Sequence, residues 1–329
     1  VYTDGKVKDY QKAIDYCDEI INSGKYDLCR EAKNGYSGYQ QLFMGDNDCN
    51  PEAMKEIIFP IRQDGLKARA YAGTTYLVSA STIAGMPYAS TGDPWKCMFA
   101  RENMVEKFFP NKKDIPMATV GDVLKNPSKE EVIAKDSEKG YGTADVIAKA
   151  GDDRALLYMG VGGCEEGKVR TINPGEAITG PLNGASFVKW SNLHADGTTQ
   201  HDQNYSDTDF PLFRLAEIYL TRAEAKYRLN GSQEGLADIL EVQGRANRKI
   251  KAKSVDEQTL IDEWCREFYM EGRRRSDLVR FGLFTGSKYL WSYKGGAENG
   301  AGIPAYYDVY PIPDNEIKNN PNMHQNPKY

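Results

Sequence analysis

The sequence has no long apolar run and no excess of basic residues. No stretch approaches the roughly 20 consecutive apolar residues that a membrane-spanning helix needs. Lysine and arginine together number 42, against 47 aspartates and glutamates, whereas a protein that neutralises phosphates needs a basic surface. The sequence therefore offers no membrane span and argues against a nucleic-acid partner.

Histidine is scarce, and the six cysteines are widely spaced. The histidines are His194, His201 and His324, and no two cysteines stand in C-x-x-C spacing, so zinc and thioredoxin-type chemistry are disfavoured. We expect His194 and His201 to be solvated side chains of a polar loop. The chain also lacks a nucleophile elbow, a Walker loop and a dinucleotide fingerprint. The sequence therefore predicts neither a metal site nor a cofactor.

Helical periodicity is clear toward both ends of the chain. Apolar residues recur at i, i+3, i+4 and i+7 over residues 9–23 and again over 209–227. The Asn-Gly pair at 230–231 ends the second helix, Ser232 caps the next one, and Ser254 opens a third with a capping box. Two antiparallel helices joined by so tight a turn form a hairpin of the tetratricopeptide type. We therefore predict a mainly α-helical fold with few short strands.

The middle of the chain, residues 65–208, is rich in Gly, Thr, Asn and Asp and has only weak periodicity. We expect long, ordered loops there, with one helix near 104–109 and one strand near 186–190. The whole chain is predicted to be a single domain. Its first segment, 1–64, holds a helix and a loop, the middle is a loop-rich excursion, and 209–329 holds the helical hairpin, a charged helix and a tail.

The tail, residues 311–329, contains four prolines and five asparagines. Proline fixes φ and removes a backbone donor, while asparagine side chains bond locally to the main chain. We expect an extended strap held in one path, without a helix or a central strand.

Three carboxylates lie on one stripe of the charged helix, because Glu263, Glu267 and Glu271 are spaced at i, i+4 and i+8. Two carboxylates of this stripe could serve as the catalytic pair of a glycoside hydrolase. However, arginines crowd the same segment, and their planar guanidinium groups pair bidentately with carboxylates. Pairing lowers the pKa of a carboxyl group, which is the wrong direction for a general acid. We predict no catalytic residue and interpret the segment as a structural network of Glu263, Glu267, Glu271, Arg274, Asp277 and Arg280.

Aromatic residues in the loop-rich middle are the best candidates for a binding site. The apolar C–H faces of sugar rings stack on Trp and Tyr, while their hydroxyl groups bond to polar side chains. A turn-rich stretch at 87–96 could present aromatic rings outward. The predicted ligand-contact residues are Tyr71, Tyr76, Tyr88, Asp93 and Trp95.

The charged helix resembles the signature of the SusD/RagB family. The matching positions are Glu263, Glu267, Phe268, Glu271, Gly272, Arg274, Asp277, Leu278, Arg280 and Phe281. Trp264 stands where the family usually has Arg, and Phe281 where it has Trp. Residues 213–225 resemble the family's alanine- and glutamate-rich helix, and 310–313 and 325–329 resemble its closing tail. Residues 2–28 resemble another of its helices, so the resemblance covers both ends of the chain well and the middle loosely.

This resemblance implies a SusD-like fold, with tetratricopeptide-like hairpins and a large irregular excursion. It also implies non-catalytic capture of an oligosaccharide or polysaccharide on the outer face of the outer membrane of Bacteroidetes. The glycan would be delivered to a TonB-dependent SusC-like transporter. The family's N-terminal part has no counterpart in the sequence, so we expect any lipid anchor to lie upstream.

Three alternatives remain open from the sequence. The cargo of the same transport machine could be a peptide or another nutrient, which would need edge strands and backbone partners. A second alternative is a glycoside hydrolase that uses pairs of Glu or Asp. A third is a helical-repeat scaffold that binds only proteins.

Overall fold

The computed structural model describes residues 9–83, 86, 87, 92, 94–162 and 184–329. Its chain divides into two units, Val1–Glu271 and Gly272–Tyr329, and each is described by itself. The segment limits expected at residues 64 and 208 lie inside the first unit.

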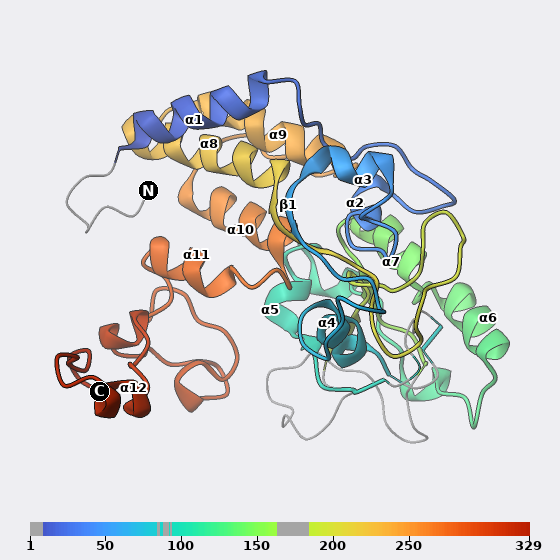
Figure 1. The fold of residues 1–329 in the computed structure, drawn as a ribbon. Helices are drawn as coiled ribbons and strands as arrows, with labels where there is room; N and C mark the ends of the chain where they lie inside the picture. Colours follow the sequence, from blue (N-terminus) through green and yellow to red (C-terminus); the bar gives the residue numbers. More distant parts are fainter. Residues whose placement is uncertain (1–8, 84–85, 88–91, 93, 163–183) are drawn as a thin grey trace. The chain divides into compact units, whose positions relative to one another are not determined.

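A layer of three helices forms one part of the first unit (Figure 1). Helix α1 (Tyr10–Asn22) lies along α8 (Leu215–Asn230), which pairs with α9 (Leu236–Arg245). Asp9 caps α1 by accepting from the Lys12 amide, 2.8 Å away. A Cβ on Gly235 would lie 2.7 Å from the Ala223 carbonyl oxygen, so the two helices of the hairpin approach closely at this glycine. The prediction of a mainly helical fold with a hairpin is confirmed.

Two predicted helix starts were wrong. Helix α8 begins at Leu215 and not at Asp209, because residues Phe210–Arg214 form strand β5, which pairs antiparallel with β1 (Ile57–Ile61). The third helix, α10 (Glu257–Phe268), is capped by Asp256, whose carboxylate accepts from the Thr259 amide at 2.6 Å. In the first case strand pairing overrides a helical apolar pattern, as tertiary context commonly does.

The middle of the chain is more regular than its sequence predicts. The expected helix overlaps α5 (Glu102–Val105), and the expected strand overlaps β4 (Ala185–Phe187). Among the described residues, β4 lies between β2 (Phe99–Ala100) and β3 (Leu157–Tyr158) in an antiparallel sheet. The sequence did not predict three further helices of the middle, α4 (Thr74–Ser81), α6 (Lys129–Lys139) and α7 (Thr143–Ala150), or the two short helices of the first segment, α2 (Gly38–Gln41) and α3 (Pro51–Glu56).

The core of the first unit consists of apolar clusters that join the helices to the loops. One cluster packs the aromatic rings of Phe108, Phe187 and Tyr269 together. A second gathers around Phe43 and Trp190, whose ring centroids are 5.0 Å apart. Because residue 269 directly follows α10, this packing fixes the end of the charged helix against the excursion.

The second unit contains α11 (Arg274–Arg280) and the tail. The prediction that the tail has no helix was wrong, because α12 (Asp314–Asn319) forms directly after Pro313. Proline suits the start of a helix, where its missing N–H group has no intrahelical role. The rest of the tail is held by its polar side chains: Gln325 and the backbone of Ile312 exchange two hydrogen bonds, of 2.8 and 2.9 Å.

Candidate functional site

Four aromatic side chains of the first unit form a row at the surface. The ring centroids of Tyr76 and Trp95 lie 5.9 Å apart, those of Trp95 and Tyr71 lie 6.2 Å apart, and those of Tyr71 and Tyr205 lie 4.8 Å apart. The guanidinium carbon of Arg69 lies over the ring of Tyr205 at 4.6 Å. We call Tyr71, Tyr76, Trp95 and Tyr205 the aromatic row.

Helix α4 and the main chain at Trp95 position three members of the row. Tyr76 lies in the first turn of α4, and Tyr71 precedes the helix by one turn of loop that contains Gly73 at φ +69°. The Trp95 amide donates to the Ser79 carbonyl at 2.9 Å. This main-chain bond brings Trp95 back to the helix that carries Tyr76.

The fourth member comes from a distant loop. The amide of Ser206, next to Tyr205, donates to the hydroxyl of Thr75 on α4 at 3.0 Å. Arg69 also forms an ion pair of 3.7 Å with Asp202 on the same loop. The row is therefore assembled from three separate segments of the chain.

The row is partly open to solvent. Tyr71 is 59% exposed and Tyr76 is 41% exposed, while Trp95 and Tyr205 are half-buried. A hydrogen bond with Tyr205 raises the pKa of Tyr71. Rings that are held by neighbours and still present an open face can stack on the apolar face of a ligand, and the phenol groups and Arg69 offer polar partners at the edge.

The structure brings together Tyr71, Tyr76 and Trp95, three of the residues that the sequence predicts as ligand contacts. Tyr88 and Asp93, also predicted, lie outside the described residues. Sequence reasoning missed Tyr205 and Arg69, which carried no local signal: each stands alone in a polar loop.

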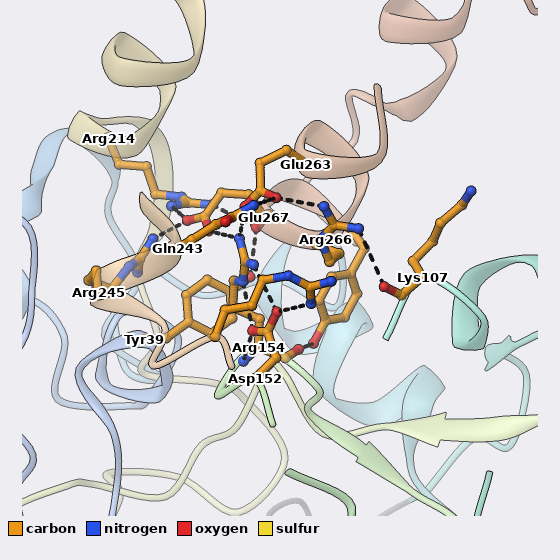
Figure 2. A network of polar contacts seen from close by, with 12 residues as sticks. Tyr39, Lys107, Asp152, Arg154, Arg214, Gln243, Arg245, Glu263, Arg266 and Glu267 are labelled. Carbon is orange, nitrogen blue, oxygen red and sulfur yellow. Dashed lines mark hydrogen bonds and ion pairs between the residues drawn. The ribbon is translucent and has the colours of Figure 1, made fainter. Parts of the chain in front are cut away.

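The stripe of glutamates on α10 lies in a buried ion-pair network (Figure 2). Glu263 accepts from Arg154 and from Arg266, each at 2.6 Å, and from Gln243 at 2.7 Å. Arg154 in turn donates to both carboxylate oxygens of Asp152, at 2.8 Å each. The carboxylate of Glu263 thus pairs with two arginines and one glutamine of the protein itself.

Glu267 lies at the centre of the network. It accepts from Arg154 at 3.0 Å, from Arg214 at 2.5 Å and from Arg245. These three arginine side chains are fully buried, as is the carboxylate they surround. Three guanidinium groups on one carboxylate hold α10 to the loop after α7, to the end of β5 and to the end of α9.

The third glutamate, Glu271, does not lie on α10 as predicted, because the helix ends at Phe268 and the chain turns at Met270, which has a φ of +59°. Glu271 accepts from Arg214 at 2.8 and 2.9 Å and from the Lys189 ammonium at 2.5 Å. Lys189 also donates to the carbonyl of Tyr269 at 2.7 Å. Burial lowers the pKa of Lys189 to about 8, although Glu271 opposes this.

The main partners of the stripe are thus distant in the sequence, whereas the predicted network drew them from the same segment. Three of the predicted network residues, Arg274, Asp277 and Arg280, lie in the second unit. There Asp277 accepts from Arg280 at 2.8 Å, and Arg274 donates to the hydroxyl of Tyr289 at 2.9 Å.

The network keeps its carboxylates ionised. Burial by itself would raise the pKa of Glu263, but Arg154 and Arg266 outweigh it and lower the pKa to about 2. At Glu267 the same competition, with Arg245 and Arg214 foremost, lowers the pKa still further. An enclosed, ionised carboxylate offers no proton to a substrate, so this geometry does not suit a general acid.

His194 does not lie in solvent as its sequence context predicts. Its side chain is only 8% exposed, and its Nε2 atom lies 3.1 Å from the carboxylate of Asp207. His201, whose side chain is 56% exposed, reaches the same carboxylate at 3.2 Å. Within the described ranges, no group of three or more histidine, cysteine, aspartate or glutamate side chains could hold a metal ion.

None of the helices in the part of the chain that the structure describes is long and apolar enough to cross a membrane.

Comparison with known proteins gives one consistent family. The sequence profile of the SusD family matches residues 55–329. The chain is 52% identical over 326 residues to the starch-binding protein SusD of Bacteroides thetaiotaomicron, an alignment that covers 98% of this chain and 56% of that protein. A SusD-like protein of Formosa agariphila, P25, is 32% identical over 147 residues, which is 43% of this chain and 27% of that one. The chain thus spans about half the length, or less, of these curated relatives.

Solved structures show the same fold at lower sequence identity. The surface glycan-binding protein A of Bacteroides thetaiotaomicron is 18% identical with a TM-score of 0.57, over 97% of this chain and 59% of that one. The same protein in complex with laminarihexaose gives a TM-score of 0.58 at 17% identity, over 96% and 59% of the two chains.

Proposed function

The chain belongs to the SusD family, and on this premise we propose that it binds a glycan of the starch type without breaking any bond in it. The aromatic row is the single observation that carries this proposal. The name of the starch-binding relative, at 52% identity, supports the choice of an α-linked glucan.

Binding would rest on stacking and on hydroxyl hydrogen bonds. Each pyranose ring has an apolar C–H face that matches the open face of a tyrosine or tryptophan ring. The planes of Tyr71 and Trp95 are inclined by 49°, and those of Trp95 and Tyr76 by 55°. A row that changes direction in this way suits a polymer that curves, as an α-linked glucan does, better than a flat one.

The family membership supports two further parts of the proposal. The glycan would be passed to a TonB-dependent transporter of the SusC type. The protein would act on the outer face of the outer membrane, where a lipid anchor would hold it.

Affinity electrophoresis against a panel of polysaccharides tests the proposal. Amylopectin should retard the protein, while cellulose derivatives should not, and Trp95→Ala should abolish the retardation without changing the melting temperature. Retardation by none of the glycans would contradict the proposal, and binding of peptides instead would favour the other cargo considered from the sequence.

The hydrolase alternative has its own test. Incubation with the same polysaccharides should release no reducing sugar. Turnover that disappears in Glu267→Gln, while the circular dichroism and melting temperature of the variant stay those of the unaltered protein, would show that this carboxylate is catalytic and would overturn its structural role.

A further inference from the structure

Tyr205, the fourth member of the aromatic row, belongs to a loop without regular secondary structure. Residues 191–209, all of which the structure describes, form neither a helix nor a strand, and we call them the Tyr205 loop. A loop of this kind keeps one conformation where buried side chains form hydrogen bonds with its backbone groups. The side chains that form those bonds therefore decide where the ring of Tyr205 lies.

The side chain of Asn192 closes the Tyr205 loop from inside. It is fully buried, and its Nδ2 atom donates to the carbonyls of Asp202 and Tyr205, at 3.3 and 3.2 Å. Its Oδ1 atom accepts from the amide of Asp207 at 2.7 Å. Because the two carbonyl groups can only accept and the backbone amide can only donate, these partners fix which way the side-chain amide points. Asn192 thus holds the main chain at Tyr205 itself and on both sides of it.

The core of the first unit fixes the position of Asn192. The preceding residue, Ser191, donates from its amide to the carbonyl of Phe43 at 3.0 Å, and its own carbonyl accepts from the hydroxyl of Thr208 at 2.7 Å. The ring of Phe43 packs against that of Trp190 in one of the apolar clusters, with the centroids 5.0 Å apart. The Tyr205 loop is therefore attached to a well-packed part of the fold at the residue next to Asn192.

Two more contacts attach the loop to segments that carry other rings of the row. The amide of Ser206 donates to the hydroxyl of Thr75 at 3.0 Å, and Thr75 is a buried residue of α4. The amide of Gly92, a few residues before Trp95, donates to the carbonyl of Gln203 at 2.8 Å. The loop that presents the fourth ring is thus bonded to the segments that present the others.

We infer that Asn192 and Thr75 are positioning residues of the glycan site, which hold the ring of Tyr205 against that of Tyr71 before the ligand arrives. This inference rests on the proposed function. Both side chains are buried and do not touch the glycan. They act through the ring of Tyr205, whose centroid lies 4.8 Å from that of Tyr71.

Preorganisation is the physical reason for this role. A ring that is already held in place loses little conformational freedom on binding, whereas a ring on a loose loop must first be ordered, which lowers the affinity. Asn192→Asp keeps the shape of the side chain and the acceptor, but it replaces the donor to Asp202 and Tyr205 by a carboxylate oxygen. That oxygen would face two carbonyl oxygens, so we expect the loop to open at Tyr205.

Amide hydrogen exchange measured by NMR tests the inference without any glycan. In Asn192→Asp the amide of Ser206 should exchange at least about tenfold faster than in the unaltered protein, because its bond to Thr75 breaks when the loop opens. The amide of Leu77, which donates to the carbonyl of Gly73 at the start of α4, should keep its rate. An unchanged rate at Ser206 would overturn the inference, whether or not the protein binds starch.

Calorimetry with a maltooligosaccharide tests the positioning role. Asn192→Asp should weaken binding about three- to tenfold, as expected when a side chain must be ordered on binding, and Thr75→Val should act in the same direction. Gln41→Glu is the matched control, because this equally buried amide donates to the carbonyl of Glu31 at 2.6 Å and accepts from Asn50 at 2.9 Å. The control should lower the melting temperature and leave the affinity unchanged.

A double-mutant cycle with Tyr205→Ala shows whether the effect passes through that ring. If it does, Asn192→Asp should cause no further loss of affinity once the ring is removed, so the two losses do not add. Thr75→Val, the milder change, completes the same cycle if Asn192→Asp does not fold. Additive losses, or an equal loss of affinity in Gln41→Glu, would refute the positioning role. An absence of glycan binding by the unaltered protein would refute the proposed function itself.

Discussion

The charged stripe and the aromatic row invert the usual placement of residue types. On α10 the carboxylates of Glu263 and Glu267 are fully buried among arginines, whereas Tyr71 and Tyr76 stand in solvent. A buried charge is tolerated only when groups of opposite charge pair with it, so the stripe holds together the chain segments that supply its arginine partners. Exposed, braced aromatic rings are ready for an external partner. We therefore propose that the buried charges hold the scaffold together and that the exposed rings bind the ligand.

Removal of one buried charge should produce the largest effect. In Glu267→Gln the charges of Arg154, Arg214 and Arg245 lose their common partner, so we expect the free energy of unfolding to fall by about 3–5 kcal/mol. Urea denaturation followed by circular dichroism measures this loss. Glu241→Gln, which breaks an exposed ion pair with Arg30, is the matched control and should change stability by less than about 0.5 kcal/mol. Equal losses of stability in Glu267→Gln and Glu241→Gln would show that the buried network stabilises the fold no more than an exposed ion pair does.

Acid should weaken the same network. The carboxyl of Glu263 has a pKa of about 2 in the folded chain, against an ordinary value of 4.5. Its stabilisation is therefore complete above pH 4.5 and is lost as the pH falls toward 2, and the difference is worth about 3 kcal/mol. Denaturation midpoints at about pH 5 and about pH 3 should differ less in Glu263→Gln than in the unaltered protein. An identical acid dependence in both would show that this carboxyl is not the titrating group.

The sequence indicates the stripe more clearly than the row. The spacing of Glu263 and Glu267 is enough by itself to place these two on one helical face, whereas Glu271 lies beyond the end of α10. Their partners could not be deduced, because Arg154, Arg214 and Arg245 come from three other segments and are aligned only by the tertiary fold. The structural interpretation of the stripe stays a prediction; it assigned the pairing to neighbouring arginines, whereas Glu267 pairs with arginines that are distant in the sequence.

The remaining misses have separate physical reasons. The capping box of Ser128 and Glu131 at the start of α6 was a readable signal that the weak periodicity of the middle obscured. Helix α12 fits between Pro313 and Pro321, where proline density had suggested a strap without any helix. Tyr205 joins the row through long-range loop bonds, and such bonds leave no periodic trace in a sequence.

The row itself should respond in affinity and not in stability. Tyr71 contacts both Trp95 and Tyr205 and is 59% exposed, so Tyr71→Ala should weaken glycan binding about tenfold while the melting temperature stays constant. Tyr16→Ala on α1 removes a ring of similar exposure, 52%, far along the chain from the row and should leave affinity unchanged. Calorimetry with the same maltooligosaccharide compares the two variants. Equal affinities of the two variants would show that the aromatic row does not bind the glycan.

The smallest effect should appear at the end of the row. Arg69 stacks over Tyr205 at 4.6 Å and pairs with Asp202 at 3.7 Å in an exposed position. Because an exposed ion pair contributes little and an exposed cation–π contact is worth about 0.5–1 kcal/mol, Arg69→Met should weaken binding by about two- to fivefold. Arg30→Met, in another exposed ion pair, is the control and should not change affinity. Arg69→Lys discriminates further: it keeps the charge but loses the planar group that stacks, so an intermediate affinity would identify stacking on Tyr205 as the contribution of this arginine.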